Sequence, residues 1–325
     1  MKKAILYLLA ILPISLHAQF DGIVGTEGCK AIHCDDSRII DWATSCQVIR
    51  GLQNIANPQG SYASYGTEND AIGKVEDGNT MDVVSLGDSG IAILTFQTPI
   101  VNGDGYDFIV FENSFSDDAL ELAFVEVSSD GVHYFRFPAT SNTPVDKQIS
   151  TFGTIDDVTK INNLAGKYRV GWGTPFDLEE LEDNENLNKD NIQYVKIIDV
   201  VGTIDPQYAT FDVHGNMVND PYPTNFASGG FDLAGIGVIN NKNSVSVFNY
   251  NELVVSIYPN PCRNFIYIHA NGCNLSIYNS LGQKLHQQQL TENTSKIDMS
   301  KYREGIYFIH LQNNKAKKCI KIIKQ

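Results

Sequence analysis

The sequence predicts an all-β protein with the architecture of a β-sandwich or a β-barrel. From residue 80 onward, short apolar or β-branched runs alternate with clusters of glycine, asparagine and aspartate. Short strands divided by turn residues in this way are typical of sandwiches and barrels. Helix-forming runs are scarce. The 325 residues are enough for one large domain or two ordinary ones.

Seven runs in the middle of the chain have the composition of strands. They are rich in valine, isoleucine and aromatic residues, and turn-forming residues bound them. The turn signals include Asn102–Gly105 (Asn-Gly-Asp-Gly) and Ser128–Gly131 (Ser-Ser-Asp-Gly). The predicted strands are Ile91–Phe96, Asp107–Phe111, Ala123–Ser128, Tyr134–Phe137, Tyr168–Gly171, Tyr194–Val200 and Ile236–Ile239.

Two short helices are also expected. Phe176–Leu187 offers Asp177 as a capping residue and acidic residues in the first turn. Asp41–Gln53 can form the second helix, within the Gly-, Asn-, Ser- and Asp-rich residues 19–79. This irregular composition predicts that residues 19–79 wrap around the sandwich rather than form a domain of their own.

The N-terminus has the order of a secretory signal peptide. Lys2 and Lys3 precede the apolar run Ala4–Leu16, and Leu-His-Ala ends the segment at residues 16–18. Cleavage is expected after Ala18. The apolar run is shorter than the roughly 20 residues of a membrane span, and no later stretch is apolar enough to cross one. The mature chain is therefore expected to have no transmembrane segment.

The formal charge changes sign near residue 250. Residues 19–250 carry 34 acidic and 12 basic side chains, a charge of −22, whereas residues 251–325 carry 4 and 10, a charge of +6. The change predicts an acidic domain over residues 19–245 and a second domain over residues 251–325, joined by an Asn-rich linker. The acidic domain is expected to bind cations and to bind no nucleic acid, because it repels phosphates.

The six cysteines fall into two groups of three. Disulfides are the expected state in an exported protein, although spacing does not determine the pairs. A zinc site that includes His33 is the alternative for the first group. The groups are Cys29, Cys34 and Cys46, then Cys262, Cys273 and Cys319.

The last 75 residues predict a small antiparallel, Ig-like β-sandwich, since each run of period two ends at Pro, Gly or Asn. Their motifs resemble the type A C-terminal sorting domain of the type IX secretion system. The resemblance implies recognition by the outer-membrane translocon, then tethering to surface lipopolysaccharide or release, so the chain is expected at the cell surface or outside the cell. The motifs are Tyr258–Pro261 (Tyr-Pro-Asn-Pro), Asn279–Gly282, Ile297–Ser300 and Gly305–Tyr307.

Acidic residues gather on the predicted loops of the acidic domain. Carboxylates and amides interleaved with glycine supply the oxygen ligands that Ca²⁺ requires, and a domain of this charge needs counter-ions. We therefore expect at least one structural Ca²⁺ ion, although solvated turn formers are the alternative explanation for loop acids. The candidate metal ligands are Asp104, Asp107, Glu112, Asp199, Asp205, Asp212, Asp220 and Asp232.

Two patterns raise the possibility of hydrolysis. Gly87–Gly90 (Gly-Asp-Ser-Gly) resembles the surroundings of a nucleophilic serine, but a tight turn explains it more simply, and His33, His133 and His214 offer no evident triad. A glycosidase needs two facing carboxylates, for which Glu112 and its neighbours Glu121 and Glu126 are candidates. Acids in strands are more often solvent-facing, so no catalytic residue is assigned and a non-enzymatic role is preferred.

Several aromatic residues lie near predicted loops, where they can stack on a sugar or another flat ligand. The alternative is that they are core-edge residues. The preferred ligand-binding candidates are Tyr106, Trp172, Tyr208 and Tyr222, and the wider set adds Phe176, Phe211 and Phe226.

Three passages of the middle domain are similar to a family of bacterial cell-surface proteins that often carry sorting tails: residues 103–115, 121–131 and 228–240. The similarity implies a jelly roll akin to galactose-binding or discoidin-type modules, in which calcium supports the loops and ligands bind at a loop-bearing end. Where that family most often has Asp-Leu-Asp-Ala, this chain has Asp232–Gly235 (Asp-Leu-Ala-Gly). A metal site that used the second acid would be weaker here.

The sequence thus predicts a secreted or cell-surface, calcium-stabilised binding protein for an extracellular glycan or another small ligand. One alternative is a secreted hydrolase of glycans or esters. Another is a surface adhesin or scaffold for protein partners.

Overall fold

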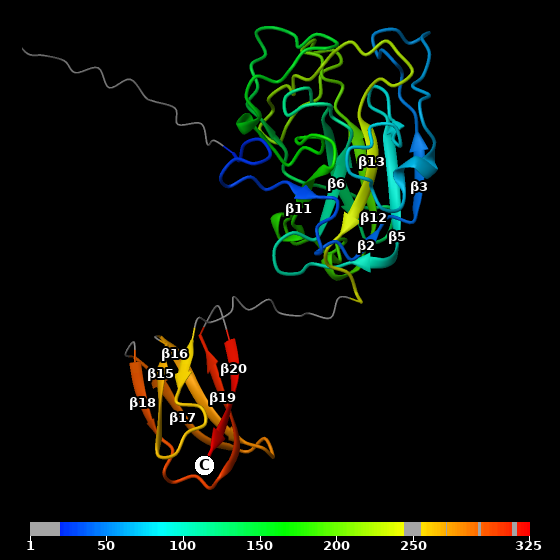
Figure 1. Ribbon diagram of the computed structural model, residues 1–325. Helices are drawn as coiled ribbons and strands as arrows, with labels where there is room; N and C mark the ends of the chain where they lie inside the picture. The colour runs from blue at the N-terminus through cyan, green and yellow to red at the C-terminus, as the bar shows by residue number, and fades with distance from the viewer. Residues whose placement is uncertain (1–19, 244–254, 271, 292–293, 314–316) are drawn as a thin grey trace, which may run out of the picture. The chain divides into compact units, whose positions relative to one another are not determined.

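The computed structural model describes residues 20–243, 255–270, 272–291, 294–313 and 317–325, in two compact units that divide between Ser244 and Val245 (Figure 1). The predicted signal peptide and most of the predicted linker lie outside the described residues. Regular structure in the described part is almost entirely β, which confirms the predicted all-β class. No helix in that part is long and apolar enough to cross a membrane.

The first unit contains strands β1 to β13 and four short 3-10 helices in its described residues. The strands are β1 Ile32–His33, β2 Asp41–Trp42, β3 Ser45–Ile49, β4 Val84–Ser85, β5 Ile91–Ile100, β6 Phe108–Glu112, β7 Ala123–Ser128, β8 Phe135–Arg136, β9 Thr140–Ser141, β10 Ile161–Asn162, β11 Trp172–Phe176, β12 Ile192–Asp199 and β13 Asp232–Val238. The 3-10 helices are η1 Glu68–Ala71, η2 Val158–Lys160, η3 Leu178–Glu180 and η4 Lys189–Asn191.

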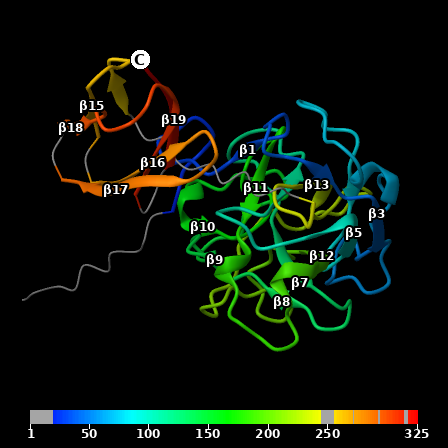
Figure 2. The same ribbon diagram turned by 90° about the horizontal axis from the view of Figure 1, so that it is seen from below.

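Two antiparallel sheets form the sandwich of the first unit. One has the order β1-β11-β6-β13-β2, with β4 also paired to β13, and the other has the order β3-β5-β12-β7-β8. Counted along the chain, the eight strands β2, β5, β6, β7, β8, β11, β12 and β13 take the order of a jelly roll, because the last strand lies between the first and the third. Figure 2 shows the two sheets as two layers.

Apolar side chains fill the space between the two sheets. On β12, Val195 and Ile197 are buried, and on β7 the buried side chains Val125 and Val127 belong to the same core. Three phenylalanine rings extend this core toward one end, with centroid distances of 4.9 to 5.8 Å: Phe108, Phe137 and Phe176. The largely alternating burial along β12 is the pattern of a strand with one face toward such a core.

The outer face of the first sheet is also covered. Ile109 and Phe111 of β6 point away from the main core and pack with Ile32, Cys34 and other residues of the N-terminal segment. All five residues of β6 are therefore buried, whereas a sheet with one solvated face would expose alternate residues.

Three local expectations are wrong. Asp41–Gln53 contains β2 and β3 rather than a helix, because Cys46 and Val48 pack against the core while β3 pairs with β5. Phe176–Leu187 contains only the 3-10 helix η3, which Asp177 caps by accepting a hydrogen bond from the N–H of Glu179. Tyr168–Gly171 is irregular, and the strand begins at Trp172.

The second unit is a small sandwich of a three-stranded and a four-stranded sheet, with orders β14-β15-β18 and β17-β16-β19-β20. Its core is formed by the inward residues of both sheets, among them Ile266, Leu275 and Ile309. Its strands are β14 Ser256–Tyr258, β15 Phe265–His269, β16 Cys273–Asn279, β17 Lys284–Leu290, β18 Thr294–Asp298, β19 Gly305–Gln312 and β20 Lys317–Lys324.

All six cysteines are free thiols, contrary to the expectation of disulfides. Cys34 packs under the outer face of the first sheet and Cys46 packs against the core between the sheets. In the second unit, Cys262 and Cys273 are buried in the core, whereas Cys319 is exposed. Cys34 and Cys46 therefore belong to different apolar clusters.

Candidate functional site

One end of the jelly roll collects most of the long loops, and it is drawn uppermost in Figure 1. Strands β6 and β12 finish at this end, at Glu112 and Asp199, while β13 begins there at Asp232. The antiparallel register places Leu233 opposite Glu112 and Asp199 opposite Ala123. Acids that lie more than a hundred residues apart in sequence therefore meet at one end of the sandwich.

A small cavity at this end is lined by four carboxylates. Its volume is about 10 Å³, which is room for a single water-sized sphere. The remaining wall includes Thr224 and Gly230. The four acids are Asp88, Glu121, Asp199 and Asp220.

Backbone N–H groups hold three of these carboxylates in place. Asp199 accepts hydrogen bonds from Ser89 N at 3.0 Å and Phe231 N at 2.7 Å. Asp220 accepts one from Leu122 N at 2.6 Å, and Asp88 one from Ile55 N at 2.7 Å. No hydrogen bond to the Glu121 carboxylate is found among the described residues, and no Lys or Arg side chain lines the cavity. Backbone N–H groups thus position three of the acids, and no basic side chain around the cavity neutralises their charge.

Burial raises the pKa of all four acids, and the charges of neighbouring acids add to this effect for Glu121, Asp199 and Asp220. Burial, followed by the charge of Asp199, raises the pKa of Asp220 well above its usual value. Burial likewise raises the pKa of Glu121 and Asp199 well above normal, and that of Asp88 to about 6. Ionisation of the four carboxyl groups in this cavity is unfavourable without a counter-charge. The cavity is therefore suited either to a bound cation or to carboxyl groups that keep their protons.

Gly230 makes close packing around the cavity possible. It adopts φ of +73°, and a Cβ atom at this position would lie 2.8 Å from Asp199 Oδ1 and from the backbone of Gly87. Only glycine combines this backbone conformation with the absence of a side chain. The loop that carries Asp220 therefore returns to β13 directly against the acidic wall.

Glu112 and Asp232 form a second acidic pair beside the cavity. Glu112 accepts hydrogen bonds from Ser114 N at 2.7 Å and from the Ser114 hydroxyl. Asp232 accepts from the Ser85 hydroxyl and from Asn113 Nδ2 at 3.3 Å. Burial raises the pKa of Glu112 to about 8 and that of Asp232 to about 6, so Glu112 is protonated at neutral pH.

Arg50 lies beside Glu112 and Asp232 but forms no salt bridge with either carboxyl group in the described structure. Arg50 donates hydrogen bonds to three backbone carbonyls, those of Tyr65, Ser85 and Gly66. It therefore joins the N-terminal segment to β4 and leaves both carboxyl groups to their hydroxyl and amide partners.

The free energy of unfolding is expected to fall as the pH rises from about 5 to about 8. The pKa of Glu112 is higher in the folded protein than in the unfolded chain, so the native state retains a proton that the unfolded chain releases. Each pH unit in this window costs about 1.4 kcal/mol for one proton. Glu112→Gln keeps the acceptor for Ser114 and should flatten the slope by about one proton, as measured by urea unfolding at several pH values.

Exposed Glu185 provides the control for this measurement. Glu185→Gln should leave the slope of the wild-type protein unchanged. A Glu112→Gln protein with the wild-type slope would show that Glu112 is not the group that retains the proton.

The structure brings half of the predicted metal ligands to one place. Asp199 and Asp220 line the cavity, and Glu112 and Asp232 lie beside it. Two of the cavity acids, Asp88 and Glu121, were missing from the predicted set. The sequence places Asp88 in the Gly87–Gly90 turn, and it favours a solvent-facing position for Glu121.

The other four predicted ligands organise turns elsewhere. Asp104 is exposed at the opposite end of the sandwich, where Asp107 accepts hydrogen bonds from Gly103 N, Leu178 N and Asn240 Nδ2. Asp205 accepts from Gln207 N at 3.0 Å. Asp212 accepts from the backbone of Ser141, His214 and Asn216.

Ala234, in the Asp232–Gly235 motif, faces away from the four-carboxylate cavity. It packs with Val75, Val83 and Phe111 on the outer face of the first sheet. It also lines a separate polar cavity of about 150 Å³. The missing second acid of this motif therefore does not weaken the four-carboxylate cavity.

The predicted ligand-binding aromatics do not form one surface. Tyr106 packs against the outer-face cluster, and Trp172 makes an edge contact with His33 at a centroid distance of 4.8 Å. Tyr222 donates a hydrogen bond to Asn54 Oδ1 at 2.8 Å, and Tyr208 accepts one from Gln207 Nε2. Tyr208 and Tyr222 both lie on the loops of residues 201–230, near the carboxylate cavity.

Exposed Phe152 escaped the sequence prediction, whereas its stacking partner Phe226 belongs to the wider set of predicted aromatics. Phe152 is 88% exposed, and its ring stacks on that of Phe226 with an interplanar angle of 2° and a centroid distance of 6.0 Å. The only sequence signal for Phe152 is an aromatic residue within the turn-rich run of residues 148–156.

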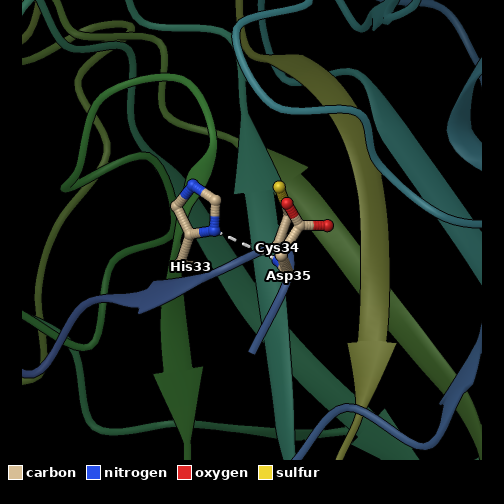
Figure 3. Close-up of side chains that lie close together, drawn as sticks. All are labelled: His33, Cys34 and Asp35. Carbon is tan, nitrogen blue, oxygen red and sulfur yellow. Dashed lines mark hydrogen bonds between the residues drawn. The ribbon is translucent and has the colours of Figure 1, made fainter. Parts of the chain in front are cut away.

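His33, Cys34 and Asp35 form the only set of three potential metal ligands within 4.8 Å of one another in the described residues (Figure 3). His33 Nδ1 accepts a hydrogen bond from Asp35 N at 3.2 Å, and its Nε2 lies 3.3 Å from Asp77. Asp35 pairs with Lys74 at 2.6 Å, and burial raises the pKa of the Cys34 thiol. The His33 ring and the Asp35 carboxylate are therefore already engaged, and the set does not include the other two cysteines of the zinc hypothesis.

Gly87–Gly90 is a turn. Gly90 N donates to Gly87 O at 2.7 Å, and Gly87 and Ser89 both have positive φ. His133 pairs with Asp130 at 2.7 Å, and in the described residues no histidine is hydrogen-bonded to Ser89. The geometry of a Ser-His pair is therefore not formed here.

Residues 256–325 match the family described as the secretion system C-terminal sorting domain. This match and the small sandwich of the second unit agree with the predicted type IX sorting tail. The chain is accordingly a cargo of type IX secretion that reaches the cell surface or the extracellular space. No curated protein matches the chain.

Two solved structures resemble the chain at low identity. One is PorZ, described as an essential bacterial surface component of the type-IX secretion system of Porphyromonas gingivalis: 13% identity over 83% of this chain, with a TM-score of 0.20. The other is described as a biofilm associated protein, BSP domain: 10% identity over 89% of this chain, also with a TM-score of 0.20. The chain spans 41% of the first structure and 53% of the second.

Proposed function

We propose that the exported chain is a binding protein of the cell surface that takes an extracellular, uncharged glycan on the loop end of its jelly roll. The loops at this end are proposed to be calcium-stabilised. After removal of the sorting domain, the first unit is either tethered to surface lipopolysaccharide or released.

The stacked pair of Phe152 and Phe226 is the observation that carries this proposal. Single exposed apolar residues are normal on a protein surface, but here the Phe226 ring supports the Phe152 ring by stacking, and the 88% exposure of Phe152 leaves a flat aromatic face open to a ligand. The C–H face of a pyranose ring packs on such a surface, as aromatic side chains supply a large apolar area at low entropic cost. Tyr208 and Tyr222 belong to the same loops and add hydroxyl groups for polar contacts.

Two contacts anchor these rings to the rest of the loop end. Thr151 Oγ1 donates to Pro223 O at 2.7 Å, which joins the loop of Phe152 to that of Phe226. Phe226 N donates to Thr224 O at 2.8 Å, and Thr224 lines the carboxylate cavity. The loop that carries Phe226 therefore also lines the cavity. A contact that fixes Thr224 in the cavity would also restrict the motion of Phe226.

The charge of the domain restricts the class of ligand. With a formal charge of −22 over residues 19–250, the surface repels nucleic acids and acidic polysaccharides. An uncharged glycan escapes this repulsion. The hydrolase alternative has no comparable support, because Glu112 is 3% exposed and its carboxyl group is bonded to Ser114.

A glycan array tests this proposal. The first unit should bind a set of neutral glycans, and Phe152→Ala should weaken binding by about fivefold, since loss of an aromatic contact is worth about 1 kcal/mol. Phe226→Ala should act in the same direction. The dissociation constants are measured by calorimetry with the best array ligand.

Phe115 supplies the matched control, because it is 78% exposed and lies outside the stacked pair. Phe115→Ala should leave the dissociation constant unchanged. An array without binding, together with capture of an envelope protein by the wild-type domain, would instead favour the adhesin alternative.

A further inference from the structure

We propose that the small cavity at the loop end is a Ca²⁺ site bound by four carboxylates and one hydroxyl: Asp88, Glu121, Asp199, Asp220 and Thr224. This inference deepens the calcium-stabilised part of the proposed function and rests on it for the extracellular setting. The residues around the cavity are enough to support the ion site, and no glycan takes part in it.

The donor set selects the kind of ion. All the side chains with metal-binding groups around the cavity offer oxygen, and no histidine or cysteine is among them. Ca²⁺ takes six to eight oxygen ligands at roughly 2.3–2.6 Å, in flexible geometry. Five side chains from this chain leave positions for backbone carbonyls or water. Zn²⁺ would require nitrogen or sulfur ligands.

The Thr224 hydroxyl is the second, independent indication of a ligand. Thr224 is 3% exposed, and its Oγ1 has no hydrogen-bond partner in the described structure. An unpaired buried hydroxyl costs about 1–3 kcal/mol, so native structures normally satisfy it. Because Thr224 lines the same cavity as the four acids, a cation there gives its oxygen a partner.

The electrostatics of the cavity point in the same direction. Four carboxylates line the same small cavity, and no basic side chain is among the residues around it. A divalent cation converts the repulsion between carboxylates into attraction and keeps them ionised. The hydrogen bonds from backbone N–H groups then serve to orient them.

Side-chain rotation completes the site. The four acids do not form a set of three oxygens within 4.8 Å, since the only such set in the described part of the chain is at His33. Glu121 is free to rotate toward the ion because its carboxylate has no hydrogen bond in the described residues. Asp88 has a single backbone donor, Ile55 N. Binding therefore tightens the loop end by drawing these two side chains inward.

The ion would join four segments that are distant in sequence. Asp88 belongs to the turn before β5, Glu121 to the loop before β7, and Asp199 to the end of β12. Asp220 and Thr224 belong to the long loop that also carries Phe226. Loops of this length have little regular structure of their own, so a shared ion stabilises them by reducing their freedom.

Titration of metal-depleted protein with CaCl₂ tests the site. The full chain without its signal peptide should bind one Ca²⁺ ion per molecule by calorimetry. Saturation should raise the melting temperature by about 5 °C or more, since an ion at 100 times its dissociation constant stabilises a domain of this size by that order. MgCl₂ should give a smaller rise, because Mg²⁺ demands a stricter octahedron.

Variants at the cavity and at a matched buried acid locate the ion. Glu121→Gln and Asp220→Asn should each weaken Ca²⁺ binding by at least about tenfold. Glu121→Gln removes no hydrogen bond of the described structure, so it remains informative if Asp220→Asn fails to fold. Asp107→Asn changes a buried acid at the opposite end and should retain the calcium-induced shift.

Absence of Ca²⁺ binding by the wild-type protein, or equal binding by Glu121→Gln and Asp220→Asn, would overturn this site. The glycan proposal fails separately, if Ca²⁺ binds as expected and the array stays blank. Binding to the array without any response to Ca²⁺ or EDTA would leave the glycan proposal standing and remove the ion.

Discussion

Truncation after residue 244 is expected to abolish delivery of the chain to the cell surface in a host with type IX secretion. The sorting domain occupies residues 256–325 and forms a compact unit of its own, so its removal leaves the first unit intact. Surface exposure should fall to background, at least tenfold below the full chain. Whole-cell protease accessibility and cell fractionation measure this loss, and the truncated protein should accumulate inside the envelope.

A core substitution separates loss of sorting from loss of expression. Ile309 is fully buried in the second unit, so Ile309→Asp should unfold that unit and mislocalise the full-length chain in the same way. Phe152→Ala, on the surface of the first unit, should leave export unchanged. A truncated chain found at the surface in normal amounts would show that another signal directs its export.

Replacement of Asp21 by alanine is expected to lower the free energy of unfolding by about 3–5 kcal/mol, the usual cost of removing one partner of a buried ion pair. Asp21 Oδ1 lies 2.8 Å from Lys167 Nζ, and the two side chains are only 5% and 2% exposed. The Tyr168 hydroxyl also donates to Asp21. Alanine would leave the ammonium of Lys167 and this hydroxyl buried without their acceptor.

The titration of Asp21 agrees with this assignment. Burial by itself raises its pKa, but the hydrogen bonds from Lys167 and Tyr168 outweigh that effect and the net pKa lies below normal. A lowered pKa contributes stability above the pKa of the unfolded chain, and this stability is lost as the pH falls through the folded value. Acid should therefore weaken the wild-type protein more than Asp21→Ala.

Urea unfolding of a double-mutant cycle measures the pair. Asp21→Ala with Lys167→Met should be less destabilising than the sum of the two single changes, because neither charge then remains unpaired. The pair of Asp35 and Lys74 is exposed on both sides, so Asp35→Ala provides a control with little expected effect. A cost of Asp21→Ala as small as that of Asp35→Ala would contradict the structural role of the buried pair.

The pair also bears on the mature N-terminus. Cleavage after Ala18 would place Asp21 three residues into the mature chain, and Phe20 N already donates to Thr159 O at 2.8 Å. Phe20 and Asp21 would then lie at the start of the exported protein, held to the first unit by a backbone hydrogen bond and an ion pair. A truncation of two or three further residues should accordingly cost more stability than a terminal tail usually does.

Local sequence determined most of the β-structure and the sorting tail. Ala123–Ser128 was predicted with the bounds it has, because an apolar and β-branched run that ends at a Ser-Ser-Asp-Gly turn is a local signal. The tail motifs around Tyr258 and Gly305 identified its class in the same way. Local sequence misled at Asp41–Gln53, where pairing with β5 overrides a weak helical pattern.

Only the tertiary structure determines which acids line the cavity. Asp199 and Asp220 were predictable as loop acids, but nothing near Asp88 or Glu121 distinguishes them from turn formers and surface acids. The jelly-roll order places β12 between β5 and β7, so the ends of strands far apart in sequence converge on one cavity. The spacing of residues along the chain does not predict which strand ends meet, because the packing of the whole core sets strand register and the pairing of the sheets.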